Sequence, residues 1–98
     1  MLFDGFDWDA GNSPKCGKHG VSRAEIEFVL SNEPDVLPDR AAAEPEIRFN
    51  AVGANREGRH VFIVFNFRLR KGARLLRPIS ARYMHRKEVA RYERRRTS

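Results

Sequence analysis

Three strand-like segments follow one another in the second half of the chain, and this succession constrains the fold more than any other feature. Residues 46–54 alternate between two faces, one of which is formed by Ile47, Phe49, Ala51 and Gly53. Residues 59–68 include the most apolar stretch, 61–65, which fits a central strand. Residues 75–83 form the third segment. The connections at 55–58 and 70–73 contain glycine and suit hairpins, so we expect an antiparallel sheet.

Two helical patterns precede these strands. Residues 12–18 are polar and fit one or two helical turns that end before Gly20. Ser22 and Glu25 have the spacing of a capping box, in which each side chain bonds the other residue's backbone N–H. This spacing and the apolar residues after it predict a helix over residues 23–31, stopped by the proline at position 34.

The remaining segments complete the order of elements. The pattern of residues 3–8 predicts a short strand. We expect a brief strand or extended piece at residues 36–37 and a loop over residues 38–45. Residues 85–95 predict a basic helix whose apolar side is formed by Val89, Ala90 and Tyr92. The order is therefore strand, helix, helix, brief strand, three strands, helix. It predicts an α+β domain with a small antiparallel sheet packed by helices on one side.

Length and composition indicate one globular domain over residues 1–98. The hydrophobic content of 41% is enough for a folded core. Cys16 is the single cysteine, which excludes an internal disulfide and suits a reducing compartment. The first residues show no signal-peptide pattern, and no apolar run is long enough to span a membrane. We therefore expect a soluble, cytoplasmic protein.

The two halves of the chain carry opposite charge. Residues 1–46 hold ten acidic and four basic residues, whereas residues 47–98 hold fifteen basic and three acidic ones. Thirteen of these fifteen bases are arginine, whose guanidinium group stays charged and binds phosphate oxygens two at a time. The second half thus favours a phosphate-rich partner, although a solvated basic surface is the alternative. The acidic first half can equally meet a basic partner segment.

Three pieces of the chain resemble the BrnT toxin family. Residues 8–22 contain a Trp-Asp pair, a polar helix and then Lys-His-Gly-Val. Residues 46–53 are similar to the family's Glu-x-Arg-aromatic-x-x-(Ile/Val)-Gly strand. Residues 58–62 and 78–84 are similar to its paired Gly-Arg and Ile-Ser-Ala-Arg strands. These pieces occur in the family's order and span most of the chain.

The resemblance implies a RelE-like ribonuclease fold and growth arrest through RNA cleavage. It also implies neutralisation by a cognate, DNA-binding BrnA-like antitoxin, and binding of the toxin–antitoxin complex to its own promoter DNA. The expected function is therefore that of a ribonuclease toxin of a type II toxin–antitoxin system.

The motifs also contain the candidate catalytic residues. Metal-independent RNA cleavage removes a proton from the 2′-hydroxyl, stabilises charge on the phosphate and protonates the 5′-oxygen. Arg48, Arg59 and Arg82 lie in or beside predicted strands, and on one sheet face they can converge on a single phosphate. The alternative is ordinary surface arginine, or an ion pair with Glu44 or Glu46.

Histidine is the side chain best suited to proton transfer near neutral pH. His19 is the first candidate, and a hydrogen bond to a nearby carbonyl is its structural alternative. His60 and His85 rank behind it, because one alternates with apolar strand residues and the other opens the last helix. The candidate RNA-binding residues are Lys18, Tyr83, Arg86 and Arg91.

Other interpretations of these residues stay open. Tyr83 and Tyr92 have spacings typical of core aromatics, and residues 91–96 are typical of a solvated helix end. The scattered histidines and Cys16 have no metal-ligand spacing, so we expect neither a metal nor a cofactor. Two further functions remain: a non-catalytic nucleic-acid-binding module, and a co-repressor that acts with the antitoxin.

Overall fold

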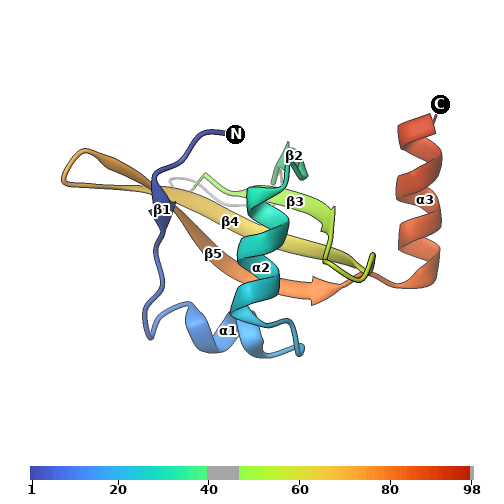
Figure 1. Cartoon of the computed structure of the whole chain (residues 1–98), viewed down its shortest axis with the longest axis horizontal. Helices are drawn as coiled ribbons and strands as arrows, with labels where there is room; N and C mark the ends of the chain where they lie inside the picture. Colours follow the sequence, from blue (N-terminus) through green and yellow to red (C-terminus); the bar gives the residue numbers. More distant parts are fainter. Residues whose placement is uncertain (40–46, 98) are drawn as a thin grey trace.

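The computed structural model describes residues 1–39 and 47–97 as an α+β domain (Figure 1). The predicted class and order of elements are confirmed. The elements are β1 (Gly5–Phe6), α1 (Ser13–Gly17), α2 (Arg23–Ser31), β2 (Asp35–Pro38), β3 (Phe49–Ala54), β4 (His60–Arg70), β5 (Ala73–Tyr83) and α3 (Arg86–Thr97). Most of the predicted loop over 38–45, together with Glu44 and Glu46, lies outside the described residues.

The five strands form one sheet in the order β1-β5-β4-β3-β2. The hairpins β3–β4 and β4–β5 are antiparallel as expected, and β2 joins β3 in the same sense. β1 differs, because it pairs with β5 in parallel and only through Gly5 and Phe6. The first strand is therefore shorter than the predicted residues 3–8. β4 and β5 are longer than predicted, since their ladder continues to Arg70 and Ala73, beyond the apolar pattern.

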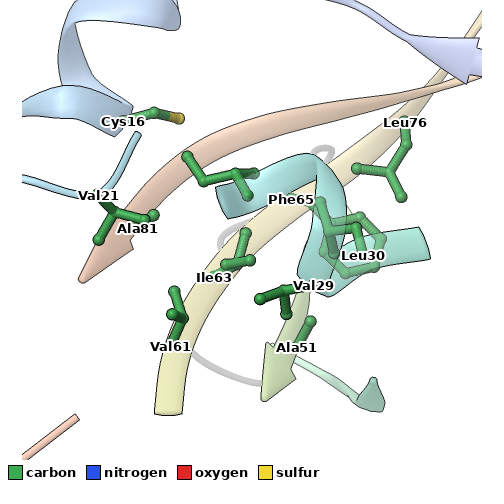
Figure 2. Close-up of a cluster of buried hydrophobic side chains, with 11 residues drawn as sticks. Cys16, Val21, Val29, Leu30, Ala51, Val61, Ile63, Phe65, Leu76 and Ala81 are labelled. Carbon is green, nitrogen blue, oxygen red and sulfur yellow. The ribbon is translucent and has the colours of Figure 1, made fainter. Parts of the chain in front are cut away.

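One face of the sheet is covered by α1 and α2, and the core lies between them and the sheet (Figure 2). The capping box at the start of α2 is present: Ser22 Oγ accepts from the Glu25 N–H, and the Glu25 carboxylate accepts from the Ser22 N–H. α2 buries Val29 and Leu30 against Ile63 and Phe65 of β4. Burial of each such side chain stabilises the fold by roughly 1.5–3 kcal/mol.

The opposite face of the sheet carries the alternate residues of the same strands and is called the open face here. Its central residues are Asn50, Val52, Phe62, Val64 and Arg82, which are only partly buried. Pairing sets Phe62 between Val52 of β3 and Arg82 of β5. Neither α1 nor α2 lies on this face, and within residues 1–39 and 47–97 the helix that contacts it is α3.

α3 stands apart from the other two helices at the end of β5 (Figure 1). None of its residues is buried, so the apolar side predicted from Val89, Ala90 and Tyr92 does not enter the core. Three apolar residues in twelve form too narrow a stripe to bury, while the basic residues of the helix require water. Among the described residues, no helix is long and apolar enough to cross a membrane.

Candidate functional site

Arg82 lies on the open face and is held by α3. Its two terminal nitrogens, Nη1 and Nη2, each donate to one oxygen of Glu88 at 2.8 Å. Its guanidinium carbon also lies 4.8 Å from the centre of the Phe62 ring. The ion pair lowers the pKa of Glu88 from 4.5 to about 2 and raises that of Arg82. Arg82 is 38% exposed, so a phosphate can reach it by displacing Glu88.

His60 faces the same helix from the neighbouring strand. Its Nε2 lies 3.0 Å from Glu93 Oε1, and its ring meets Tyr92 edge-on at 5.6 Å between centroids. His60 is two residues from Phe62, the partner of Arg82, so His60 and Arg82 are diagonal neighbours on the open face. Such neighbours lie roughly 7–8 Å apart, within reach of long side chains. Sequence analysis ranked His60 behind His19, because the alternation of His60 with apolar residues does not show that Arg82 lies next to it on β5.

Arg48 also belongs to the open face, but to its other end. It precedes Phe49, which pairs with Phe65, whereas Arg82 pairs with Phe62. The separation along β4 is about four residues, or roughly 13 Å at the rise of a β-strand. Arg48 is half-buried there. Arg48 and Arg82 are also two strands apart, since β3 and β5 flank β4, so they lie on the same face but are not neighbours.

Arg59 lies across the sheet, on the side of α2. Its guanidinium carbon is 3.6 Å from the centre of the Tyr83 ring, and the Tyr83 hydroxyl donates to Glu25 of α2 at 2.7 Å. Adjacent residues of a strand point to opposite faces, so Tyr83 and Arg82 diverge. The structure consequently does not bring Arg48, Arg59 and Arg82 into the single pocket expected from the sequence.

Glu25 organises this second cluster, and sequence analysis gave it only a capping role. Its carboxylate accepts hydrogen bonds from Asn55 Nδ2 at 2.9 Å and from the Tyr83 hydroxyl. These bonds, that of Asn55 first, lower the pKa of Glu25 from 4.5 to about 2. The same carboxylate raises the pKa of Tyr83. Glu25 thus remains ionised at neutral pH and is a poor general base.

Lys18 and His19 lie in the turn between α1 and α2. Both are exposed, and Gly20 follows them with a φ of 87°, the left-handed conformation expected after a helix end. Ser22, three residues beyond His19, caps the helix that carries Glu25. Lys18 and His19 thus lie between the two helices that cover the core face of the sheet, the face opposite Arg82.

A groove of about 290 Å³ separates α3 from the open face. The predicted RNA-binding residue Arg91 lines it from the helix, whereas Arg86 is exposed at the start of α3. The strand side is lined by Leu37, Asn50, Val52 and Phe62. Sequence analysis missed this groove, because its two walls come from segments that only the fold brings together. Within the described part of the chain, no cluster of three His, Cys, Asp or Glu side chains could hold a metal ion.

This geometry defines a basic α+β domain with one helix-covered face and one open, arginine-bearing face, a class suited to binding polyanions. A family model described as the ribonuclease toxin BrnT of type II toxin–antitoxin systems matches residues 8–88, and the chain belongs to that family. The family resemblance of the sequence is thereby confirmed. No match is found among curated proteins.

Proposed function

We propose that this chain is a metal-independent endoribonuclease that cleaves RNA bound across the open face. The observation that carries this proposal is the position of Arg82, which lies on the face of the sheet opposite α1 and α2, beside a groove lined by Arg91. Membership of a ribonuclease toxin family supports the reaction class. The proposed phosphate site is thus the end of the open face beneath α3.

Arg82 is the proposed stabiliser of the phosphate in the transition state. Its two nitrogens already hold a planar carboxylate, and phosphate oxygens accept the same pair of bonds. An incoming phosphate would take the place of Glu88, and Arg82 would then neutralise the charge that develops on the oxygens. A donor aimed at such charge contributes about 10²–10³-fold to the rate.

His60 is the proposed group for proton transfer on this face. Imidazole exchanges protons near neutral pH, and the Glu93 carboxylate at 3.0 Å orients the ring. His19 and Arg59 lie on the other side of the sheet from this phosphate. A role for them, and for Lys18 and Tyr83, therefore requires RNA that continues around the end of β5.

The remaining open-face residues would position the RNA. We propose that Arg48 binds a neighbouring phosphate and that Arg86 and Arg91 bind the strand from the side of α3. In the cell, cleavage would arrest growth until a cognate BrnA-like antitoxin neutralises the toxin, and the complex would bind its promoter DNA. The family description supports an antitoxin partner.

The test is incubation of the purified chain with labelled single-stranded RNA, with and without a metal chelator. We expect discrete fragments that persist in the chelator, and growth arrest when the chain is expressed without a partner. Salt-sensitive binding without fragments would contradict the proposal and favour a non-catalytic binding module. Tighter promoter binding by an antitoxin, without fragments or growth arrest, would favour the co-repressor.

A further inference from the structure

The groove between α3 and the open face has a composition that the cleavage chemistry does not require. Its apolar lining is formed by Leu37, Val52, Phe62 and Met84, and Arg91 and Arg95 stand on the α3 side. Two carboxylates also line the groove, and each is engaged by a group of the chain itself: Asp35 by Tyr92 and Arg96, and Glu88 by Arg82. Tyr92 lines it as well, so aromatic rings from a strand and from a helix face the same space. Aromatic rings that stack bases, combined with arginines along the backbone path, are how proteins hold single-stranded nucleic acid.

Asn50 supplies an uncharged polar group on the strand side of this groove. Its Oδ1 is buried and has no hydrogen-bond partner among the described residues. Leaving such an acceptor unpaired is unfavourable, so a ligand that donates to it gains affinity. Oδ1 is therefore an acceptor that a donor on a ligand can satisfy.

Size and charge select the occupant. A groove of about 290 Å³ is at the lower end of the size of small-molecule pockets, so it suits one planar nucleobase better than a whole helix. The arginines on the α3 side complement phosphates on either side of that base. Phe62 also pairs with Arg82, so a base in the groove would adjoin the phosphate that Arg82 holds.

We infer that this groove binds one unpaired nucleobase of the RNA and that Asn50 reads its edge. The inference rests on the proposed function, because it assigns the substrate contact next to the cleavage site. Unpaired bases are recognised by stacking and by hydrogen bonds to their edges, and an amide side chain forms such a bond as donor, acceptor or both. Asn50 is then the residue that sets the sequence preference of cleavage.

The experiment measures binding of four uncleavable 2′-O-methyl RNA hexamers, one of each base, to the wild type and to Asn50→Ala. The wild type is expected to prefer one base. The substitution should reduce the ratio between the weakest and the tightest Kd by roughly tenfold, since one good edge contact discriminates between bases by at least about that factor. Asn66→Ala is the matched control, because Asn66 lies on β4 outside the groove residues. Thermal unfolding of each variant verifies folding.

Equal binding of the four hexamers by the wild type would overturn the inference, as would an unchanged preference in Asn50→Ala. The latter is the result expected if a protein segment, rather than RNA, occupies the groove. Because the hexamers cannot be cleaved, this experiment is independent of catalysis. A preference that depends on Asn50 in a chain that cleaves no RNA would support the nucleobase site and refute the proposed ribonuclease function.

Discussion

At the scale of single residues, the site is divided by the alternation of one strand. Arg82 and Tyr83 are neighbours in β5, yet Arg82 bonds Glu88 of α3 on the open face while Tyr83 bonds Glu25 of α2 on the other. Groups that act on one phosphodiester must lie within hydrogen-bond reach of it. Under the proposed function, cleavage at Arg82 would involve His60, whereas cleavage near Tyr83 would involve Arg59.

Two substitutions separate a catalytic role for Arg82 from a structural one. Arg82→Ala removes the phosphate ligand and should lower RNA cleavage about 10²–10³-fold. Glu88→Gln breaks the same ion pair but keeps the guanidinium, so cleavage should be retained or increased. Rates are measured on labelled RNA with folding checked by circular dichroism. Equal losses in both variants would mean that the pair matters only as a structural link.

The histidines are distinguished in the same way. We expect His60→Ala to lower the cleavage rate about 10²–10⁴-fold, the usual contribution of a positioned acid or base. The control is His19→Ala, because His19 is exposed in the turn between α1 and α2, the helices on the opposite face of the sheet. Single-turnover rates across pH 5–9 report the difference. The assignment is wrong if His19→Ala is the slower enzyme.

At the scale of elements, α2 and α3 are attached to the sheet by different forces. α2 buries Ile26, Val29 and Leu30 completely or nearly so, whereas α3 buries none of its residues. The described contacts of α3 are mainly polar: Glu88 with Arg82, Glu93 with His60, and Tyr92 and Arg96 with Asp35. α2 is therefore part of the folded core, and α3 is the element that a ligand can move most easily.

The contact between α2 and β3 depends on a glycine. A Cβ added at Gly53 would lie 2.9 Å from Val29 Cγ1, and the branched Val29 has little freedom to turn away within a helix. Gly53→Ala should therefore lower the free energy of unfolding by about 1–3 kcal/mol. Gly17→Ala is the control, because a Cβ there meets nothing within 4 Å. Urea denaturation compares them, and equal midpoints would show that the helix shifts without cost.

The ion pair of α3 has a defined pH dependence. Folding lowers the pKa of Glu88 from 4.5 to about 2, so the stabilisation that its ion pair with Arg82 provides is fully present above about pH 4.5. That contribution is lost as the pH falls from 4.5 through 2. Amide hydrogen exchange in α3 should accelerate over this range, after correction for the intrinsic rate. Glu88→Gln should remove the transition, and a transition that persists in this variant would assign it to another group.

At the scale of the whole molecule, the acidic first half neutralises part of the basic second half. Asp7 lies 3.2 Å from Arg77 and within 4 Å of Arg68 and Arg70. Asp9 bonds Arg77, which lowers the pKa of Asp9 to about 2. The acids near β1 thus meet arginines of the chain itself. Away from these pairs, α3 carries the basic residues Arg86, Lys87, Arg91, Arg94, Arg95 and Arg96.

This charge distribution predicts the salt dependence of RNA binding. Each phosphate neutralised on a single strand contributes about −0.7 to the slope of log K against log salt. Arg91→Ala should make the slope shallower by about that amount and weaken all four hexamers alike, unlike Asn50→Ala. Lys15→Ala, on the exposed side of α1, should change nothing. Equal slopes for the wild type, Arg91→Ala and Lys15→Ala would show that the RNA does not bind at Arg91.

The sequence by itself determined the elements and their order. Hydrophobic period, the capping box at Ser22 and the glycine connections are local signals, so the α+β class and the hairpins followed from them. These local signals could not predict the parallel pairing of β1 with β5, because that pairing joins residues seventy positions apart. The lengths of β4 and β5 were also missed, since a strand continues wherever its neighbour provides hydrogen bonds.

The composition of the site was decided only by the tertiary structure. The motifs identified Arg48, Arg59 and Arg82 as a set, but the face on which each lies depends on register and on the end of its strand. The pairing of Arg82 with Glu88, the approach of His60 to α3 and the groove at Asn50 all depend on where the last helix turns after β5. The sequence specifies the chemistry of each side chain, whereas distant segments become neighbours only when the chain has folded.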